Sequence, residues 1–111
     1  MKTLESVTSG TFRKEILESE VPVLVDFYTT WCPGCRAVRP VLESLAAEFE
    51  GKARIVQVNV EEEPLLGAEY GITAVPTLAF FKGGLLRGTI QGGRPAAVLR
   101  QALQELVAEA A

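Results

Sequence analysis

The sequence predicts a three-layer α/β/α protein, in which a central mixed sheet of about four to five strands is flanked by about four helices. Short apolar runs that suit strands alternate with longer segments whose apolar residues recur at helical spacing. Near the C-terminus two strands meet at the glycine pair 83–84, which predicts an antiparallel hairpin. With 111 residues, 48% of them hydrophobic, the chain suits one compact domain spanning residues 1–111.

The first predicted helix covers residues 8–19, after a segment that is either strand or coil. Thr8 or Ser9 suits its N-cap, and Pro22 ends it. An apolar, β-prone run then predicts a buried strand over residues 23–28. The apolar stripe of the helix consists of Phe12, Ile16 and Leu17.

A long helix is predicted over residues 33–50, with Gly51 placed to terminate it. Pro40 lies inside this helix and is expected to kink it, because proline removes one backbone donor and clashes with the preceding turn. We interpret this proline as a matter of packing geometry. The apolar residues at helical spacing are Val38, Val41, Leu42, Leu45 and Phe49.

A further strand is marked by Ile55, Val56, Val58 and Val60, and a short helix follows it. Pro64 suits the first position of this helix, which ends at Gly71. The three glutamates at 61–63 favour its positive N-terminal end, so we interpret them as a solvated cap.

Two strands and a helix complete the predicted fold. The strands cover Thr77–Lys82 and Leu85–Gln91, and the helix runs from about Pro95 to Ala108. The residues of this helix expected to face the core are Val98, Leu99, Ala102, Leu103 and Leu106.

The only two cysteines, Cys32 and Cys35, lie where the buried strand 23–28 gives way to the long helix. Residues three apart share one side of a helix, close enough for the short span of a disulfide. A Cys-x-x-Cys pair in this context is typical of a redox motif. A purely structural disulfide is the weaker alternative, because so short a loop constrains the unfolded chain little.

Composition excludes several other functions. Without histidine, the chain has neither a Cys-His dyad nor a histidine metal ligand. The two cysteines of one chain cannot complete a tetrahedral site, although two chains could share a metal cluster. We therefore expect no metal. A net charge of −3 with scattered basic residues argues against nucleic acid as a partner. The N-terminal residues resemble no signal peptide, and no apolar run could span a membrane, so we expect a soluble cytoplasmic protein.

Several motifs, in order and spacing, make the chain resemble the thioredoxin family over nearly its whole length. They are Val25-Asp26-Phe27-Tyr28, Trp31 before the first cysteine, Pro40, Tyr70-Gly71-Ile72, Val75-Pro76-Thr77, Phe80-Phe81-Lys82-Gly83-Gly84 and Gly92. The resemblance implies a thioredoxin fold and a dithiol oxidoreductase that reduces protein disulfides, with disulfide-containing proteins as substrates. It also implies no bound cofactor, and reducing equivalents from NADPH through a flavin enzyme, thioredoxin reductase. We expect a monomer.

The resemblance makes Cys32 the exposed attacking thiol and Cys35 the more buried resolving thiol. Amide groups and the helix dipole at the N-terminus of the long helix independently favour a thiolate at Cys32. Cys35 must lose its proton in a poorly hydrated site, which requires a base. Asp26, a carboxylate in an apolar strand, is the candidate, since burial raises its pKa. The residues alone equally allow a structural aspartate; the resemblance favours proton transfer.

A substrate-docking surface around the cysteines is also implied by the resemblance. Val75-Pro76 resembles the family's cis-proline loop, whose backbone would pair with an extended substrate strand. A trans proline that opens a strand is the alternative. The remaining residues assigned to this surface are Trp31, Pro33, Gly34, Ile72, Ala74 and Gly92.

This chain departs from the family pattern at several positions. Most thioredoxins have Gly-Pro between the cysteines, whereas this chain has Pro33-Gly34. The Gly34 amide could donate a hydrogen bond to the Cys32 thiolate, which predicts a more oxidising couple, although glycine flexibility opposes the gain. Gln57 stands near a position where many thioredoxins carry a lysine, so Asp26 is less stabilised as an anion.

Two further departures, Tyr28 in place of a second tryptophan and Gln91 before Gly92, make the surroundings more polar. They leave substrate and reductase preference open. Two alternative functions also remain. One is a more oxidising thiol exchanger of glutaredoxin or disulfide-isomerase character. The other is a thioredoxin-fold subunit that holds a partner protein or a bridging cluster and does not use its cysteines catalytically.

Overall fold

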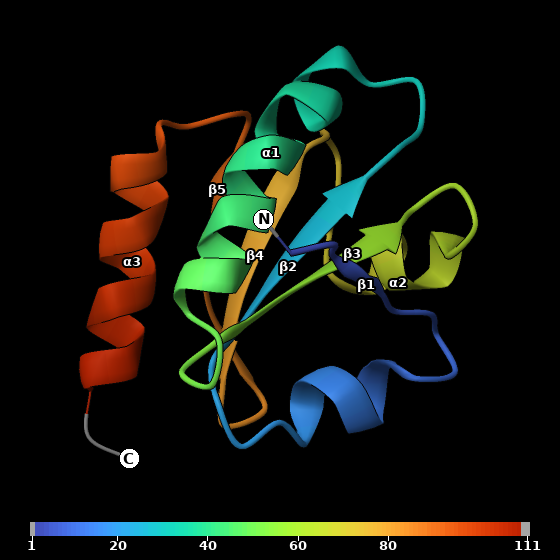
Figure 1. The fold of residues 1–111 in the computed structure, drawn as a ribbon. Coiled ribbons are helices and arrows are strands. Elements are labelled where there is room, and N and C mark those ends of the chain that lie inside the picture. The colour runs from blue at the N-terminus through green and yellow to red at the C-terminus, as the bar shows by residue number, and fades with distance from the viewer. Residues whose placement is uncertain (1, 110–111) are drawn as a thin grey trace.

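The computed structural model describes residues 2–109, which form one five-stranded mixed sheet in the order β1-β3-β2-β4-β5 (Figure 1). Strands β1, β3 and β2 run parallel, while β4 is antiparallel to β2 and β5 is antiparallel to β4. This confirms the predicted mixed sheet. The strands are β1 (Glu5–Ser6), β2 (Val23–Tyr28), β3 (Arg54–Asn59), β4 (Thr77–Lys82) and β5 (Leu85–Gln91).

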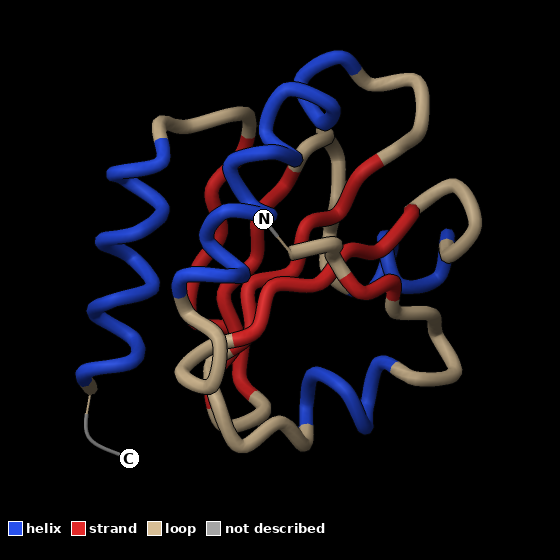
Figure 2. The backbone as a smooth tube through the Cα atoms, in the orientation of Figure 1, coloured by secondary structure: helices blue, strands red, loops and turns tan. Residues whose placement is uncertain are grey.

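Four helices cover the two faces of this sheet within the described residues, as Figures 1 and 2 show. Helices α1 and α3 pack on one face, in a core that includes Leu42 and Leu103. The other face is covered by η1 and α2, which contribute Ile16 and Leu66 to a second core. The helices are η1 (Arg13–Leu17), α1 (Pro33–Glu48), α2 (Pro64–Glu69) and α3 (Ala96–Ala108).

The central strand β2 is buried on both faces, and its residues alternate between the two cores. Leu24 belongs to the core under α1 and α3, whereas Val25 and Phe27 belong to the core under η1 and α2. Asp26 lies two positions after Leu24 and therefore faces α1. Its register partners are Gln57 of β3 and Leu78 of β4.

The first helix is much shorter than the predicted segment 8–19. Only Arg13–Leu17 is helical, with a π-type hydrogen bond from the Glu18 amide to the Arg13 carbonyl. The expected N-cap at Thr8 or Ser9 is wrong, because the Thr8 amide bonds instead to Oγ1 of Thr11 in a separate turn. Such local bonds of threonine compete with helix formation.

The two longer helices follow their predicted stripes with one exception. Helix α1 runs through Pro40 to Glu48, and Gly51 follows with a φ of 84°. In α3, Leu99, Leu103 and Leu106 are buried, but Val98 is 46% exposed. The expectation that Val98 faces the core is wrong, because one residue turns a helix by about 100°.

The glutamates before α2 do not cap that helix, whose N-cap Glu63 makes no side-chain capping bond. Oε1 of Glu61 accepts from the Thr30 amide at 3.3 Å, and Oε1 of Glu63 accepts from the Ser9 amide at 2.7 Å. Glu61 and Glu62 are exposed, as expected of a solvated charge run, and the side chains of Glu61 and Glu63 in addition tie neighbouring loops together.

Candidate active site

The two cysteines lie at the N-terminus of α1, at the top in Figure 1. Cys32 is the N-cap residue, Pro33 takes the first helical position, and the Cys35 amide donates to Sγ of Cys32 at 3.1 Å. The expected donor was Gly34. In the structure the donor is the Cys35 amide, because the side chain of an N-cap residue accepts a hydrogen bond from the amide three residues further on.

The Val75–Pro76 peptide bond is cis, and its loop lies against the cysteines. The Cys32 thiol donates to the Val75 carbonyl at 3.6 Å. A Cβ added to Gly34 would lie 3.4 Å from Cδ of Pro76, so the two segments are in close contact. Gly92, which has a φ of 79°, donates its amide to the Pro76 carbonyl at 2.8 Å.

Both cysteines are buried in the reduced protein, which corrects the expectation that Cys32 is exposed. Cys32 is 4% and Cys35 is 1% accessible, since the Val75 loop covers the N-terminus of α1. The two thiols differ instead in their position relative to a surface hollow. Cys32 lines this hollow of about 540 Å³, and Cys35 does not.

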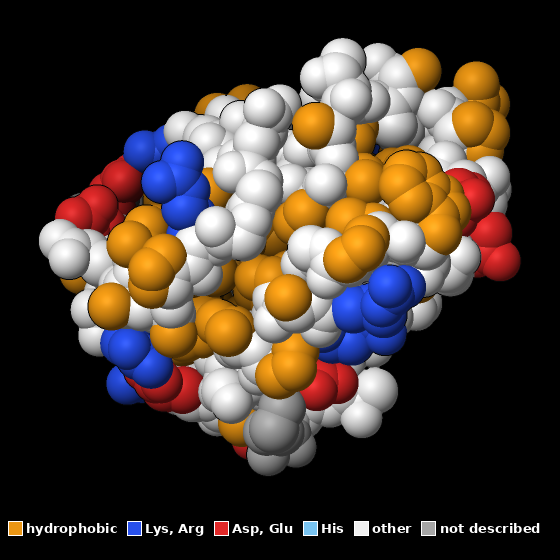
Figure 3. All heavy atoms as spheres, turned by 90° about the horizontal axis from the view of Figure 1, so that it is seen from above, with side chains coloured by type: hydrophobic (Ala, Val, Ile, Leu, Met, Phe, Trp, Pro, Cys, Tyr) orange, Lys and Arg blue, Asp and Glu red, His pale blue; other side chains and the backbone are white. Residues whose placement is uncertain are grey.

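Most of the predicted docking residues line that hollow. Trp31, which lines it, is 64% exposed. Figure 3 looks onto the end of the molecule where α1 begins and shows hydrophobic side chains gathered there. Pro76 and Gly92 do not line the hollow; Pro76 belongs to the Val75 loop, and Gly92 is joined to this loop by its hydrogen bond to the Pro76 carbonyl. Sequence reasoning missed Thr29, Val60 and Thr73; no chemical pattern marked them. The predicted residues in the lining are Trp31, Cys32, Pro33, Gly34, Ile72, Ala74 and Val75.

Asp26 is fully buried below the cysteines, on the face of the sheet that α1 covers. Within residues 2–109, neither of its carboxyl oxygens has a hydrogen-bond partner. Burial raises the pKa of Asp26 to about 7, and the positive charge of Arg39 opposes this rise. Such a carboxyl group exchanges a proton readily near neutral pH.

The pKa of Cys35 is raised well above its ordinary value, first by burial and then by its hydrogen bond with Cys32. The negative charge of Asp26 contributes to the same rise, so the two groups influence each other. Cys35 therefore stays protonated at neutral pH unless a base removes its proton.

Arg39 is a site residue that sequence reasoning missed. Its guanidinium carbon lies 5.3 Å from the centroid of the Tyr28 ring, and its Nε is buried. One signal was present: Arg39 follows Cys35 by four residues, which places both side chains on the same side of α1.

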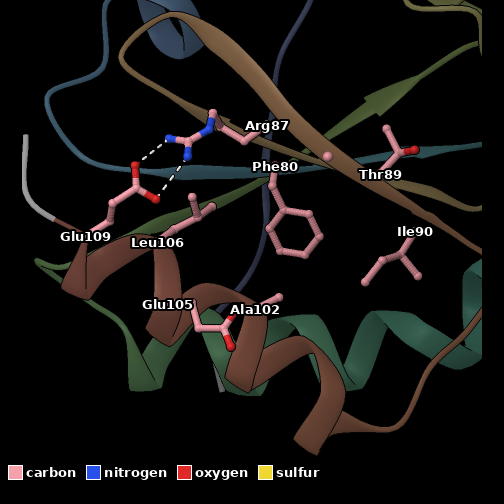
Figure 4. A pocket seen from close by; sticks show the side chains of 9 residues that line it. Phe80, Arg87, Thr89, Ile90, Ala102, Glu105, Leu106 and Glu109 are labelled. Atoms are coloured by element: carbon pink, nitrogen blue, oxygen red, sulfur yellow. Dashed lines mark hydrogen bonds and ion pairs between the residues drawn. The ribbon is translucent and has the colours of Figure 1, made fainter.

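A second hollow, of about 320 Å³, lies between β5 and α3 (Figure 4). Its floor includes Phe80 and Leu106, and Arg87 pairs with Glu109 at its rim at 2.8 Å. None of the cysteine or cis-proline residues line it, so we assign it no part in the chemistry described above.

Two features of the described residues bear on other functions. Across residues 2–109, no group of three or more His, Cys, Asp or Glu side chains is arranged to hold a metal ion. In the same part of the chain, no helix combines the length and apolarity needed to cross a bilayer.

Two thiols at the start of a helix, with a cis-proline loop against them, define a dithiol redox protein. Comparison with known families gives the same class, because the family model described as Thioredoxin matches residues 3–105. The chain belongs to the thioredoxin family.

Individual relatives agree over nearly the whole chain. Thioredoxin 1 of Nostoc sp. is 44% identical over 105 residues, which cover 95% of this chain and 98% of the relative. The chloroplastic M-type thioredoxin of Chlamydomonas reinhardtii is 42% identical over 100 residues, covering 90% of this chain and 71% of the relative. With both cysteines present, the chain is a protein-disulfide oxidoreductase that acts by thiol-disulfide exchange.

Proposed function

We propose that Cys32 is the attacking thiol, Cys35 the resolving thiol, and Asp26 the base that serves Cys35. The observation that carries this assignment is the asymmetry between the thiols. Cys32 borders the surface hollow and accepts an amide hydrogen bond at its sulfur, whereas Cys35 lies inside, away from that hollow. Only Cys32 can meet a substrate sulfur without movement of the helix.

The exchange then has two steps. The Cys32 thiolate attacks one sulfur of a substrate disulfide, forming a mixed disulfide and releasing the other substrate sulfur as a thiolate. Asp26 then accepts the Cys35 proton, and the Cys35 thiolate attacks Sγ of Cys32. The second substrate sulfur leaves as a thiolate and takes up a proton, while the protein retains a Cys32–Cys35 disulfide.

Docking of an extended substrate segment relies on the Val75 backbone and the surrounding apolar surface. In the reduced protein the Val75 carbonyl accepts a hydrogen bond from the Cys32 thiol, so this carbonyl lies where a substrate strand would reach the sulfur. Pairing through backbone atoms gives recognition that tolerates many sequences. Trp31, Pro33, Gly34, Ile72 and Ala74 supply the apolar contacts.

Four further expectations belong to this proposal. Reducing equivalents come from NADPH through a flavin-containing thioredoxin reductase, and the protein itself holds no cofactor. It acts as a monomer. We place it in the cytoplasm; relatives from cyanobacteria support this, although chloroplastic relatives also exist. Residues 1–111 form a single domain, which is supported by the one sheet of the described residues.

Trapping with matched cysteine variants tests the assignment of roles. Cys35→Ser should accumulate mixed disulfides on Cys32 when it reacts with insulin, and Cys32→Ser should accumulate far fewer, because Cys35 lies away from the surface hollow. Mass spectrometry of the adducts reports which sulfur is bonded. Equal trapping by the two variants would contradict the assignment.

The source of electrons is tested separately. The unmodified protein should sustain insulin reduction in the presence of NADPH and thioredoxin reductase. Turnover with glutathione and glutathione reductase alone would instead favour the glutaredoxin-like alternative. No turnover, together with a Cys32 that resists alkylation, would favour the partner-binding subunit.

A further inference from the structure

Arg39 lies on the side of α1 that faces the sheet, one turn after Cys35. Its neighbours on this side of the helix, Cys35 four positions before it and Leu42 three positions after it, are both buried. Nε of Arg39 is itself buried and has no hydrogen-bond partner among residues 2–109. The guanidinium carbon lies 5.3 Å from the centroid of the Tyr28 ring, a distance suited to a cation–π contact. The guanidinium thus lies over the Tyr28 ring, with its Nε shielded from solvent.

Tyr28 and Asp26 are two positions apart on β2 and point to the same face of the sheet. Two residues of a strand span about 6.6 Å, so a guanidinium on the Tyr28 ring lies on the same side of the sheet as the carboxyl group. This is why the charge of Arg39 acts on the Asp26 carboxyl group and opposes the effect of burial.

Within residues 2–109, the other elements packed around Asp26 bring no second cation to it. Strand β3 presents the neutral side chain of Gln57, and β4 presents Leu78. Helix α3 contributes apolar residues such as Leu103 to this core, and α1 contributes the thiol of Cys35 beside Arg39. Among the described residues, the charge that stabilises the Asp26 carboxylate therefore comes from α1.

We propose that Arg39 is a positioning residue for thiol-disulfide exchange, and that its guanidinium, held against Tyr28, is the cation that keeps Asp26 partly ionised near neutral pH. The proposal rests on the role of Asp26 as base. An ionised Asp26 can accept the Cys35 proton, and a protonated Asp26 cannot. Arg39 thus acts on the second step of the exchange, through Asp26, without touching the substrate.

Two measurements test this in parallel. The ¹³C resonance of the Asp26 carboxyl group reports its titration in the reduced protein. Stopped-flow reaction with dithiobis(nitrobenzoate) releases one aryl thiolate at each step, so its second phase reports attack by Cys35. The variants are Arg39→Met, which keeps length and loses charge, and Arg39→Lys, which keeps the charge. Arg36→Met is the control, since Arg36 is an exposed cation on the same helix.

Loss of the Arg39 charge should move the Asp26 titration to higher pH by about half a pH unit or more. The second phase should then slow about threefold at pH 6 and stay unchanged at pH 9, where Asp26 is ionised in both proteins. Arg39→Lys should retain most of the wild-type profile. An unmoved Asp26 titration in Arg39→Met, or an equal displacement in Arg36→Met, would overturn the proposal.

A positive charge introduced on β3, the strand beside Asp26, distinguishes an electrostatic effect of Arg39 from an effect on packing. Gln57→Lys in the Arg39→Met background should bring the Asp26 titration back toward lower pH, because residue 57 is the register partner of Asp26. Failure of this added lysine to move the titration would count against charge as the cause. If the titration moves but the second phase keeps its pH profile, Arg39 remains the charge partner of Asp26, and the role of Asp26 as base fails.

Discussion

The backbone amide of Cys35 donates a hydrogen bond of 3.1 Å to Sγ of Cys32. The side chain that caps α1 is thus the sulfur of the proposed attacking thiol, so the same contact serves the helix and the chemistry. A thiolate accepts such a bond more strongly than a thiol does, and the start of the helix therefore favours the reduced, ionised form.

This contact leads to a prediction about Pro33 and Gly34. The donor is residue 35, whose amide is present whichever residue precedes it. We therefore expect the exchange Pro33→Gly with Gly34→Pro to change the reduction potential by less than about 30 mV, which corresponds to about 1.4 kcal/mol. Equilibration with a glutathione buffer measures it. A shift of the exchanged variant to a clearly more reducing potential would restore the idea that the Gly34 amide makes the couple oxidising.

Burial of Asp26 should make stability depend on pH. The pKa of its carboxyl group is about 7 in the folded protein and 3.8 ordinarily, so the folded state binds more protons than the unfolded state between these values. Stability then falls as the pH rises from about 4 to about 7.

Asp26→Asn removes this titration while keeping the size of the side chain. Relative to wild type, the variant should gain up to about 4 kcal/mol in free energy of unfolding between pH 4 and pH 8. Urea denaturation of both reduced proteins at the two pH values measures the gain. A difference between the two proteins that does not vary with pH would show that Asp26 titrates normally.

The hairpin glycines Gly83 and Gly84 offer a matched pair of substitutions. Both have positive φ angles, of 61° and 80°, which suit glycine and strain alanine by about 1 kcal/mol. A Cβ on Gly83 meets nothing within 4 Å, whereas one on Gly84 lies 2.9 Å from the carbonyl oxygen of Leu17.

Gly84→Ala should therefore lower the free energy of unfolding by about 1 kcal/mol more than Gly83→Ala, because the hairpin must move away from the end of η1. Chemical denaturation of the two variants measures both losses. Equal losses would mean that the backbone near Leu17 adjusts without cost.

Trp31 should contribute to docking and little to stability. Its side chain is 64% exposed beside Cys32, so few of its contacts hold the fold. We expect Trp31→Ala to lower kcat/KM for insulin about tenfold, with a change in the free energy of unfolding within about 0.5 kcal/mol. The rate with dithiobis(nitrobenzoate), a small substrate, provides the comparison. Equal losses for both substrates would indicate an effect on Cys32 itself.

Local sequence patterns predicted most of the helices and strands of this protein. The glycine pair 83–84 predicted the hairpin between β4 and β5, because positive φ angles are a property of the residues themselves. Stripes with helical spacing predicted α1, and the apolar run before Cys32 predicted the buried strand β2. The first helix was overestimated, because the turn that Thr8 and Thr11 form depends on bonds that an apolar stripe does not reveal.

What the sequence determined by itself was the order of the elements, the thiol pair at the start of α1, and a carboxylate inside an apolar strand. Tertiary structure alone decided which groups those side chains meet. The contact between Cys32 and Val75 joins residues 43 positions apart, and Arg39 reaches the Asp26 side of the sheet because α1 packs over β2. Such distances depend on how elements pack, and packing is a property of the whole sheet and its helices.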